Sequence, residues 1–238
     1  MKRIVIFLGI SLLLTAAAGA AGFGDILKSA GGVITKGSLT DDEIVRGLKE
    51  ALEIGTVNAV AGAGRADGYL GNPAIRIPLP GPVQKVESLL RSTGYSETVD
   101  RFVTSMNRAA EEAAPEAKAI FWDAIKAMSI TDARRILNGG DNEATVYFEE
   151  KTSQKLSERF KPVVRKAMGE VGATRAYQDL DTRLQALPFS DSLRFDLDQY
   201  VTEGAMDGLF HLLAEEEAKI RSDPSARVTD LLQKVFTR

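Results

Sequence analysis

Apolar residues recur every three or four positions through most of the chain after residue 40, and this spacing constrains the fold more than any other feature. It places such residues on one face of an α-helix, whereas strands carry apolar residues at every second position. The first segment begins with a capping box, in which the Thr40 hydroxyl and the Glu43 carboxylate bind each other's free backbone N–H groups. Ile44, Leu48 and Leu52 continue it at helical spacing. The pattern therefore predicts an all-α protein.

Further helices follow, each bounded by a capping residue, a glycine or a proline. The predicted ranges are 83–94, 96–128, 129–138, 141–162, 163–172, 177–187, 198–221 and 229–236. Gly94 suits the left-handed end of a helix. Pro115 is expected either to kink the helix in which it lies or to start a new helix after Ala114. Pro162 is expected to separate two helices, because proline has no N–H to donate. No convincing repeat of 20–50 residues and no domain boundary is found, so we expect one multi-helix domain.

Residues 68–82 form the one extended segment that the sequence predicts, and we call them the strap. Four prolines within ten residues exclude a helix interior there, namely Pro73, Pro78, Pro80 and Pro82. Three aliphatic residues are evenly spaced at alternate positions between them, namely Ile75, Ile77 and Leu79. A flexible linker has no need of such spacing. The strap is therefore expected to lie packed on the helices, with one side facing the core.

Residues 1–20 have the three-part layout of a secretory signal peptide. Lys2 and Arg3 make a positive start, an apolar stretch occupies residues 4–14, and the small residues Ala18-Gly19-Ala20 match a cleavage site. The apolar stretch is shorter than the roughly 20 residues of a spanning helix. A cleaved signal peptide and a periplasmic location are therefore expected.

Cleavage after Ala20 or after Ala21, or retention as an N-terminal anchor, is left open by this pattern. With a cleaved signal, residues 21–238 are expected to form a single all-α domain with no stable membrane insertion, because no other stretch is apolar enough to span a bilayer.

Composition excludes several classes of function. The net charge is −3, and no basic patch is found of the kind that nucleic acids attract, so no nucleic-acid partner is expected. The chain has no cysteine and a single histidine. Disulfides, thiol catalysis, iron–sulfur clusters and cysteine zinc sites are thereby excluded, and a lone histidine cannot supply a two-histidine metal site. We expect no cofactor.

Several strings resemble an exported bacterial family known as domain-of-unknown-function family 4197. They are LTDDEIVRGLKEAL at 39–52, NPAIRIPLP at 72–80, SMNRAAE at 105–111, ILNGGD at 136–141 and DGLF at 207–210. Their shared order extends the resemblance over essentially the whole mature chain. The resemblance implies a single helical domain exported by Gram-negative-type bacteria. It implies no activity and assigns no catalytic residue.

His211 is the first candidate for a functional side chain. Glu215 follows one helical turn later, close enough for an i, i+4 pair. Such a pair can orient a histidine as a general base or a metal ligand. The simpler interpretation, which we favour, is a histidine at the edge of a mostly buried helix that pairs with its neighbour.

Arg76, Asn107 and Arg108 form the second candidate group. Arg76 lies between two aliphatic residues of the strap, while Asn107 and Arg108 lie on a helix rich in alanine. One hypothesis places the two arginines on either side of a groove, with Asn107 supplying a directional hydrogen bond. The alternative is a local salt bridge between Arg108 and Glu111 or its neighbour, one turn away.

These observations favour a non-enzymatic binding protein of the cell envelope, whose partner is an unidentified envelope protein or component. The main alternative is a carrier of an apolar small molecule or lipid held between helices, since alanine-rich faces can leave room for one. A carboxylate-dependent hydrolase is allowed by the abundant acidic residues, but no specific motif favours it. Enzymatic activity is thus left open, and the balance is against it.

Overall fold

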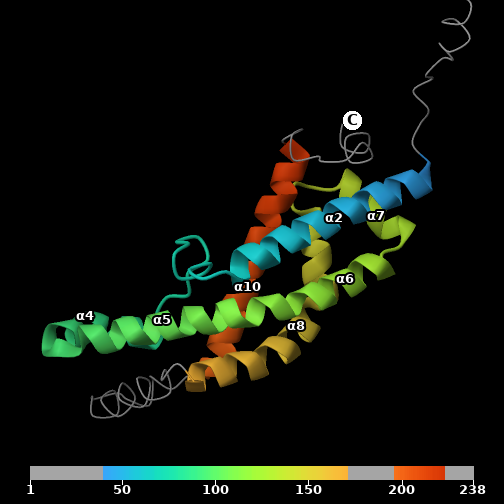
Figure 1. The fold of residues 1–238 in the computed structure, drawn as a ribbon. Coiled ribbons are helices and arrows are strands. Elements are labelled where there is room, and N and C mark those ends of the chain that lie inside the picture. The colour runs from blue at the N-terminus through green and yellow to red at the C-terminus, as the bar shows by residue number, and fades with distance from the viewer. Residues whose placement is uncertain (1–39, 171–195, 223–238) are drawn as a thin grey trace, which may run out of the picture. The chain divides into compact units, whose positions relative to one another are not determined.

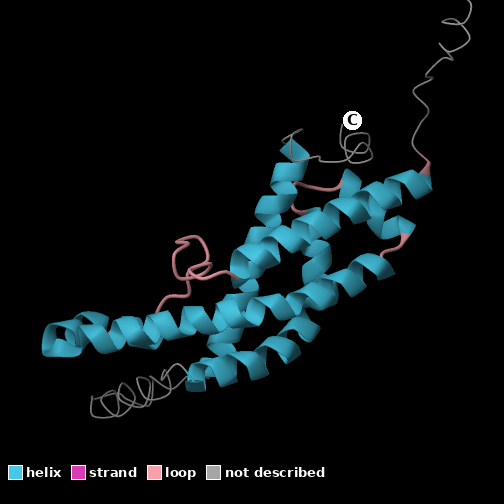
Figure 2. Ribbon diagram, in the orientation of Figure 1, coloured by secondary structure: helices cyan, strands magenta, loops and turns pink. Residues whose placement is uncertain are grey.

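The computed structural model describes residues 40–170 and 196–222. The predicted signal peptide and the predicted helices at 177–187 and 229–236 lie outside the described residues. The helices are α2 (Asp41–Gly64), α3 (Gly81–Gln84), α4 (Glu87–Leu90), α5 (Ser96–Ala113), α6 (Ala117–Ala127), α7 (Ile130–Asn138), α8 (Glu143–Glu170) and α10 (Leu197–Ser222) (Figures 1 and 2). These helices belong to one compact unit, which confirms the predicted single all-α fold. Within the described ranges, none is long and apolar enough to cross a membrane.

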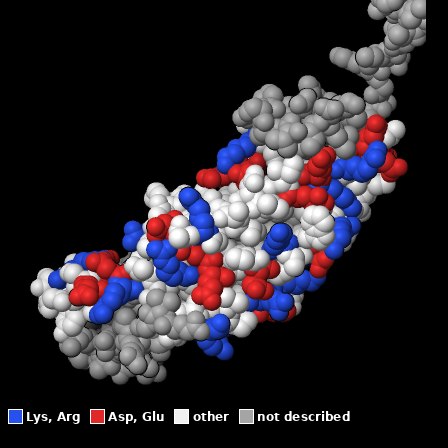
Figure 3. Space-filling model, in the orientation of Figure 1, with Lys and Arg blue, Asp and Glu red and all other residues white. Residues whose placement is uncertain are grey.

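Long helices pack around one apolar core. α10 packs against α2, α5 and α8, and α6 fills the space between α2 and α8. Aromatic rings from different helices meet at the centre, where Phe121 of α6 and Phe148 of α8 lie 5.0 Å apart in an edge-to-face arrangement. The surface is mixed in charge: on the face seen in Figure 3, basic and acidic side chains are interspersed.

Most predicted boundaries are confirmed, because local chemistry fixes them. Thr40 and Glu43 form the predicted capping box, with the Glu43 amide donating to the Thr40 hydroxyl over 3.3 Å. Gly94 has a φ of 92°, in the left-handed region that glycine tolerates. A short 3₁₀ turn, Ala114–Glu116, surrounds Pro115 and divides the predicted long helix into α5 and α6.

The prediction that Pro162 ends a helix is wrong. α8 continues through it to residue 170. Pro162 is exposed, while Phe160 and Val164 on either side are fully buried. The apolar stripe therefore continues in the same helical register. Burying it favours one long helix despite the lost backbone hydrogen bond and the clash of the proline ring, which together cost about 3 kcal/mol.

The strap begins as a series of turns and becomes extended only over residues 76–80. Asp67 has a φ of 60° near its start, and the Asn72 carbonyl accepts hydrogen bonds from the Ile75 and Arg76 amides. The predicted alternation is confirmed. The inward residues Ile75, Ile77 and Leu79 are at most 5% exposed, whereas Arg76 and Pro78 face the solvent.

Candidate functional site

Asn107 fixes the strap to α5. The Ile77 amide donates to Asn107 Oδ1 over 2.8 Å, and Asn107 Nδ2 donates back to the Ile77 carbonyl over 2.9 Å. The same Nδ2 also donates to the Val103 carbonyl. The side chain is fully buried. One amide therefore satisfies both polar groups of a buried strap residue, as a neighbouring strand would.

One turn further along α5, Glu111 holds the first part of the strap. Its carboxylate is buried and accepts hydrogen bonds from the amides of Tyr69 and Leu70, over 3.1 and 3.2 Å. Arg108 neutralises this buried charge from 2.6 Å and reaches Asp67 at 2.7 Å. Hydrogen bonds to Glu111 and then to Asp67 raise the pKa of the Arg108 guanidinium. The predicted local salt bridge of Arg108 is thus present.

Two glycines of α10 allow the strap to lie directly on that helix. A Cβ atom at Gly208 would lie 2.5 Å from the ring of Tyr69, and one at Gly204 would lie 3.1 Å from Ile77. The buried Tyr69 hydroxyl donates to the Ala205 carbonyl, and the Tyr200 hydroxyl donates to the Pro78 carbonyl over 3.1 Å. Any larger side chain at the two glycines would push the strap away from α10.

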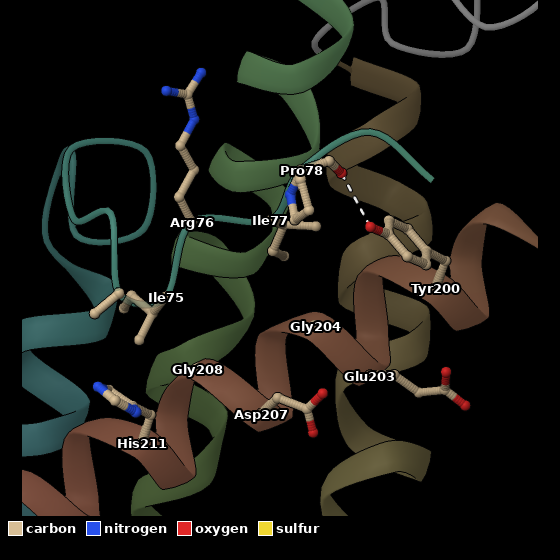
Figure 4. Close-up of a pocket in the computed structure, with 11 residues that line it drawn as sticks. Ile75, Arg76, Ile77, Pro78, Tyr200, Glu203, Gly204, Asp207, Gly208 and His211 are labelled. Carbon is tan, nitrogen blue, oxygen red and sulfur yellow. Dashed lines mark hydrogen bonds between the residues drawn. The ribbon is translucent and has the colours of Figure 1, made fainter. Parts of the chain in front are cut away.

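An open groove of about 390 Å³ lies between strap residues 74–78 and α10 (Figure 4). Its α10 side follows one face of that helix from Tyr200 to His211. Arg76 rises from the strap and points away from α10, whereas Glu203 and Asp207 extend from α10 away from the strap. The groove therefore separates a basic rim from an acidic one.

The charged side chains of the two rims differ in whether they have a partner within the described residues. The side chains of Arg76 and Asp207 make no hydrogen bond or ion pair with another described residue. Glu203 accepts a hydrogen bond from Gln199, and His211 Nε2 lies 3.4 Å from Glu215, which confirms that predicted pair. Burial, and then the negative charge of Glu203, raise the pKa of Asp207. The groove thus keeps charged groups available to a ligand.

Of the four residues proposed from the sequence, the structure brings Arg76 and His211 to this groove. Asn107 and Arg108 do not line it, because their polar atoms hold the strap. Sequence reasoning missed Glu203 and Asp207. Their signal was the spacing of four residues that places them on the same face of α10 as His211.

No metal-binding site is evident in residues 40–170 and 196–222. These ranges contain no group of three or more histidine, aspartate and glutamate side chains arranged to hold an ion. The arrangement of the groove suits recognition of a ligand through charge, shape and a short apolar surface.

Comparison with known proteins identifies the family. No curated protein and no solved structure matches the chain. A family model described as "Protein of unknown function (DUF4197)" matches residues 38–237, which is nearly the whole chain. The match includes every helix described above and the whole strap. The chain therefore belongs to domain-of-unknown-function family 4197.

Proposed function

We propose that the protein is a non-enzymatic binding protein of the cell envelope that receives its partner in the groove between the strap and α10. Export to the periplasm is part of the proposal. Its support is the signal-peptide pattern of residues 1–20.

The observation that carries the binding role is a groove in which one charge on each rim, Arg76 and Asp207, makes no hydrogen bond or ion pair with another described residue. Arg108, Arg134 and Arg165 each lie within 2.7 Å of a carboxylate. Arg76 and Asp207 are different, since neither is paired within the described part of the chain. The strap is already fixed before a ligand arrives, so little conformational entropy is lost on binding.

Site-specific photo-crosslinking in cells tests this role. A photoreactive amino acid replaces Ala74, which is exposed and lines the groove, or Ala119, an exposed alanine of α6 that is not among the groove residues. We expect a discrete adduct from position 74 that position 119 does not give. Absence of an adduct at 74, or the same adducts at both positions, would overturn the proposal.

Native mass spectrometry of the protein purified from the periplasm identifies the mass of a bound partner and tests whether it occupies the groove. A bound molecule that is lost in Ala74→Trp and kept in Ala119→Trp supports the groove. An apolar molecule retained equally by both variants supports the carrier instead and contradicts the groove. Recovery of the protein from the cytoplasm with residues 1–20 intact would contradict export.

One observation favours a second function, carboxylate-dependent hydrolysis. Asp207 has a raised pKa beside a second carboxyl group, as a general acid requires. However, Glu203 and Asp207 extend from the same helix on the same side of the groove (Figure 4), and glycosidases place their two carboxyl groups on either side of the scissile bond. Glycan cleavage that disappears in both Glu203→Gln and Asp207→Asn would favour the hydrolase over binding alone.

A further inference from the structure

The chemistry of the groove narrows the class of ligand. Its two rims have opposite charge and lie on separate elements, with Arg76 on the strap and Glu203 and Asp207 on α10 (Figure 4). Arg76 forms no ion pair across the groove with either acid. The structure thus holds opposite charges apart and open, and a ligand that carries both charges can satisfy both rims.

The acidic rim is suited to a cationic group. Glu203 and Asp207 lie four residues apart on α10, or about 6 Å along the helix axis, and their like charges oppose each other. Burial raises the pKa of Asp207 most, and this repulsion by Glu203 raises it further. An ammonium or guanidinium group placed between them removes the repulsion, whereas a phosphate or other anion adds to it.

The surface between the rims is short and apolar. Ile75 and Ile77 of the strap and the two glycines of α10 contribute to its lining. A volume of about 390 Å³ is near the lower end of the range of small-molecule sites, roughly 300–1,000 Å³. It accommodates a few residues of a peptide. The acyl chains of a lipid need a longer apolar channel than one flanked by charges on both sides.

Building on the proposed function, we propose that the groove binds a short peptide that carries both an amino group and a free carboxylate. The amino group lies against Glu203 and Asp207, the carboxylate is directed to Arg76, and the intervening chain crosses the groove between the two rims. Tyr200 and His211, at the two ends of the α10 side, limit the length of the bound segment.

Titration calorimetry with three matched peptides tests this ligand class on the full chain. N-acetyl-Ala-Lys-Ala has both charges, its C-terminal amide lacks the carboxylate, and N-acetyl-Ala-Gln-Ala lacks the ammonium group. We expect each of the last two to bind about tenfold more weakly than the first, since each loses one charge-assisted interaction. Equal affinities for all three peptides contradict the proposal.

Variants of the protein show which rim binds the ammonium group of the peptide and which binds its carboxylate. In Arg76→Gln, removing the peptide carboxylate is expected to cause no further loss of affinity. The lysine peptide should still bind more tightly than the glutamine peptide. In Asp207→Asn and Glu203→Gln, the lysine and glutamine peptides are expected to bind with more similar affinities. Replacing the peptide carboxylate by an amide should still weaken binding. Arg101→Gln and Glu112→Gln, exposed positions of α5 outside the groove, serve as matched controls. Peptide preferences that do not change in the rim variants overturn the assignment.

The two proposals fail in different ways. If no peptide binds at millimolar concentration while crosslinking at position 74 still gives a discrete partner, the ligand class is wrong and the groove function stands. If crosslinking fails too, both are wrong. If the protein cosediments with phosphatidylethanolamine vesicles and Arg76→Gln does not, the ligand of the groove is a lipid headgroup and the peptide proposal is wrong. All the rim side chains are exposed, so circular dichroism is expected to show unchanged folding in every variant.

Discussion

Asn107 shows how much depends on one side-chain amide. It satisfies the donor and the acceptor of the Ile77 peptide unit in a fully buried position. The sequence marked Asn107 as a candidate because an asparagine is unusual on an alanine-rich helix. Its partner is 30 residues away along the chain, so no local pattern could identify its role. Arg76 was predictable, since alternation in the strap places it outward between two buried isoleucines.

Replacing Asn107 with alanine is expected to destabilise the protein strongly. The change leaves a buried N–H and a buried carbonyl of Ile77 without partners, at about 1–3 kcal/mol each. We expect a loss of about 3 kcal/mol in the free energy of unfolding, measured by urea denaturation. Asn58→Ala, which removes an exposed amide bonded to Glu216, should cost less than about 1 kcal/mol. Equal losses in the two variants would contradict the role of Asn107.

Asp207 is expected to reduce stability at neutral pH. Its pKa is raised in the folded state, first by burial and then by Glu203, so the folded protein holds this proton more tightly than the unfolded chain. Stability is therefore lost as the pH rises from the unfolded pKa of about 3.9 through the higher folded pKa. Asp207→Asn should raise Tm at pH 7 by about 1–2 °C, with no gain below about pH 3.9. A gain in Tm of the same size at about pH 3 would contradict this account.

At the scale of elements, α10 is the platform on which the groove is built. Gly204 and Gly208 admit Tyr69 and the strap, and the residues just before them, Glu203 and Asp207, form the acidic rim. The starts of helices could be predicted from the sequence where a capping residue precedes the first turn, as Thr40 does for α2 and Ser129 for α7. It did not predict the passage of α8 through Pro162, because that depends on which side of the helix is buried. The acidic rim was missed since exposed acids are common on helices and only the strap gives these two a function.

Gly208→Ala is expected to destabilise the contact between α10 and the strap. The new Cβ would meet the ring of Tyr69 at 2.5 Å, and that ring is held by its own buried hydroxyl. Overpacking should outweigh the gain in helix propensity and cost about 2 kcal/mol. Gly55→Ala provides the comparison, because its Cβ would meet neighbours only at 3.7 Å or more. Thermal unfolding should show that variant to be more stable by about 0.5–1 kcal/mol.

Glu217 of α10 caps the start of α8 from outside that helix. Its buried carboxylate accepts hydrogen bonds from the amides of Ala144 and Thr145 over 3.0 and 2.9 Å, and Arg221 lies 2.7 Å away. Glu217→Gln leaves one amide without an acceptor and removes a charge favoured at a helix N-terminus. We expect a loss of about 2 kcal/mol in urea unfolding. The neighbouring Glu216→Gln loses contacts nearer the surface, so its free energy of unfolding is expected to fall by less than about 1 kcal/mol. Equal losses of stability in the two variants would refute the capping role of Glu217.

At the scale of the whole molecule, strap and helices share one apolar core. Tyr69, Ile75 and Ile77 belong to the same cluster of buried residues as the centres of α5, α8 and α10. Such a cluster predicts that the strap opens only when the helices unfold, because opening it exposes their apolar faces. The groove should then be as rigid as the core beneath it.

Hydrogen exchange of single amides measures this rigidity. We expect the Ile77 amide to exchange with an opening free energy within about 1 kcal/mol of that of Leu209, in the middle of α10. In Asn107→Ala, the Ile77 amide should exchange faster than that of Leu209. Opening of Ile77 at a much lower free energy in the unaltered protein would show that the strap moves independently of the core.

The hydrogen bonding of the strap also has a consequence for how these molecules behave at high concentration. From Ala74 to Ile77 every N–H is bonded within the molecule, and Pro78 and Pro80 have none. An extended, apolar surface segment usually offers a row of donors to which a strand of another molecule can add, which is a common start of aggregation. This one offers almost none. The protein can therefore display an extended backbone beside its groove without becoming a template for β-sheet assembly.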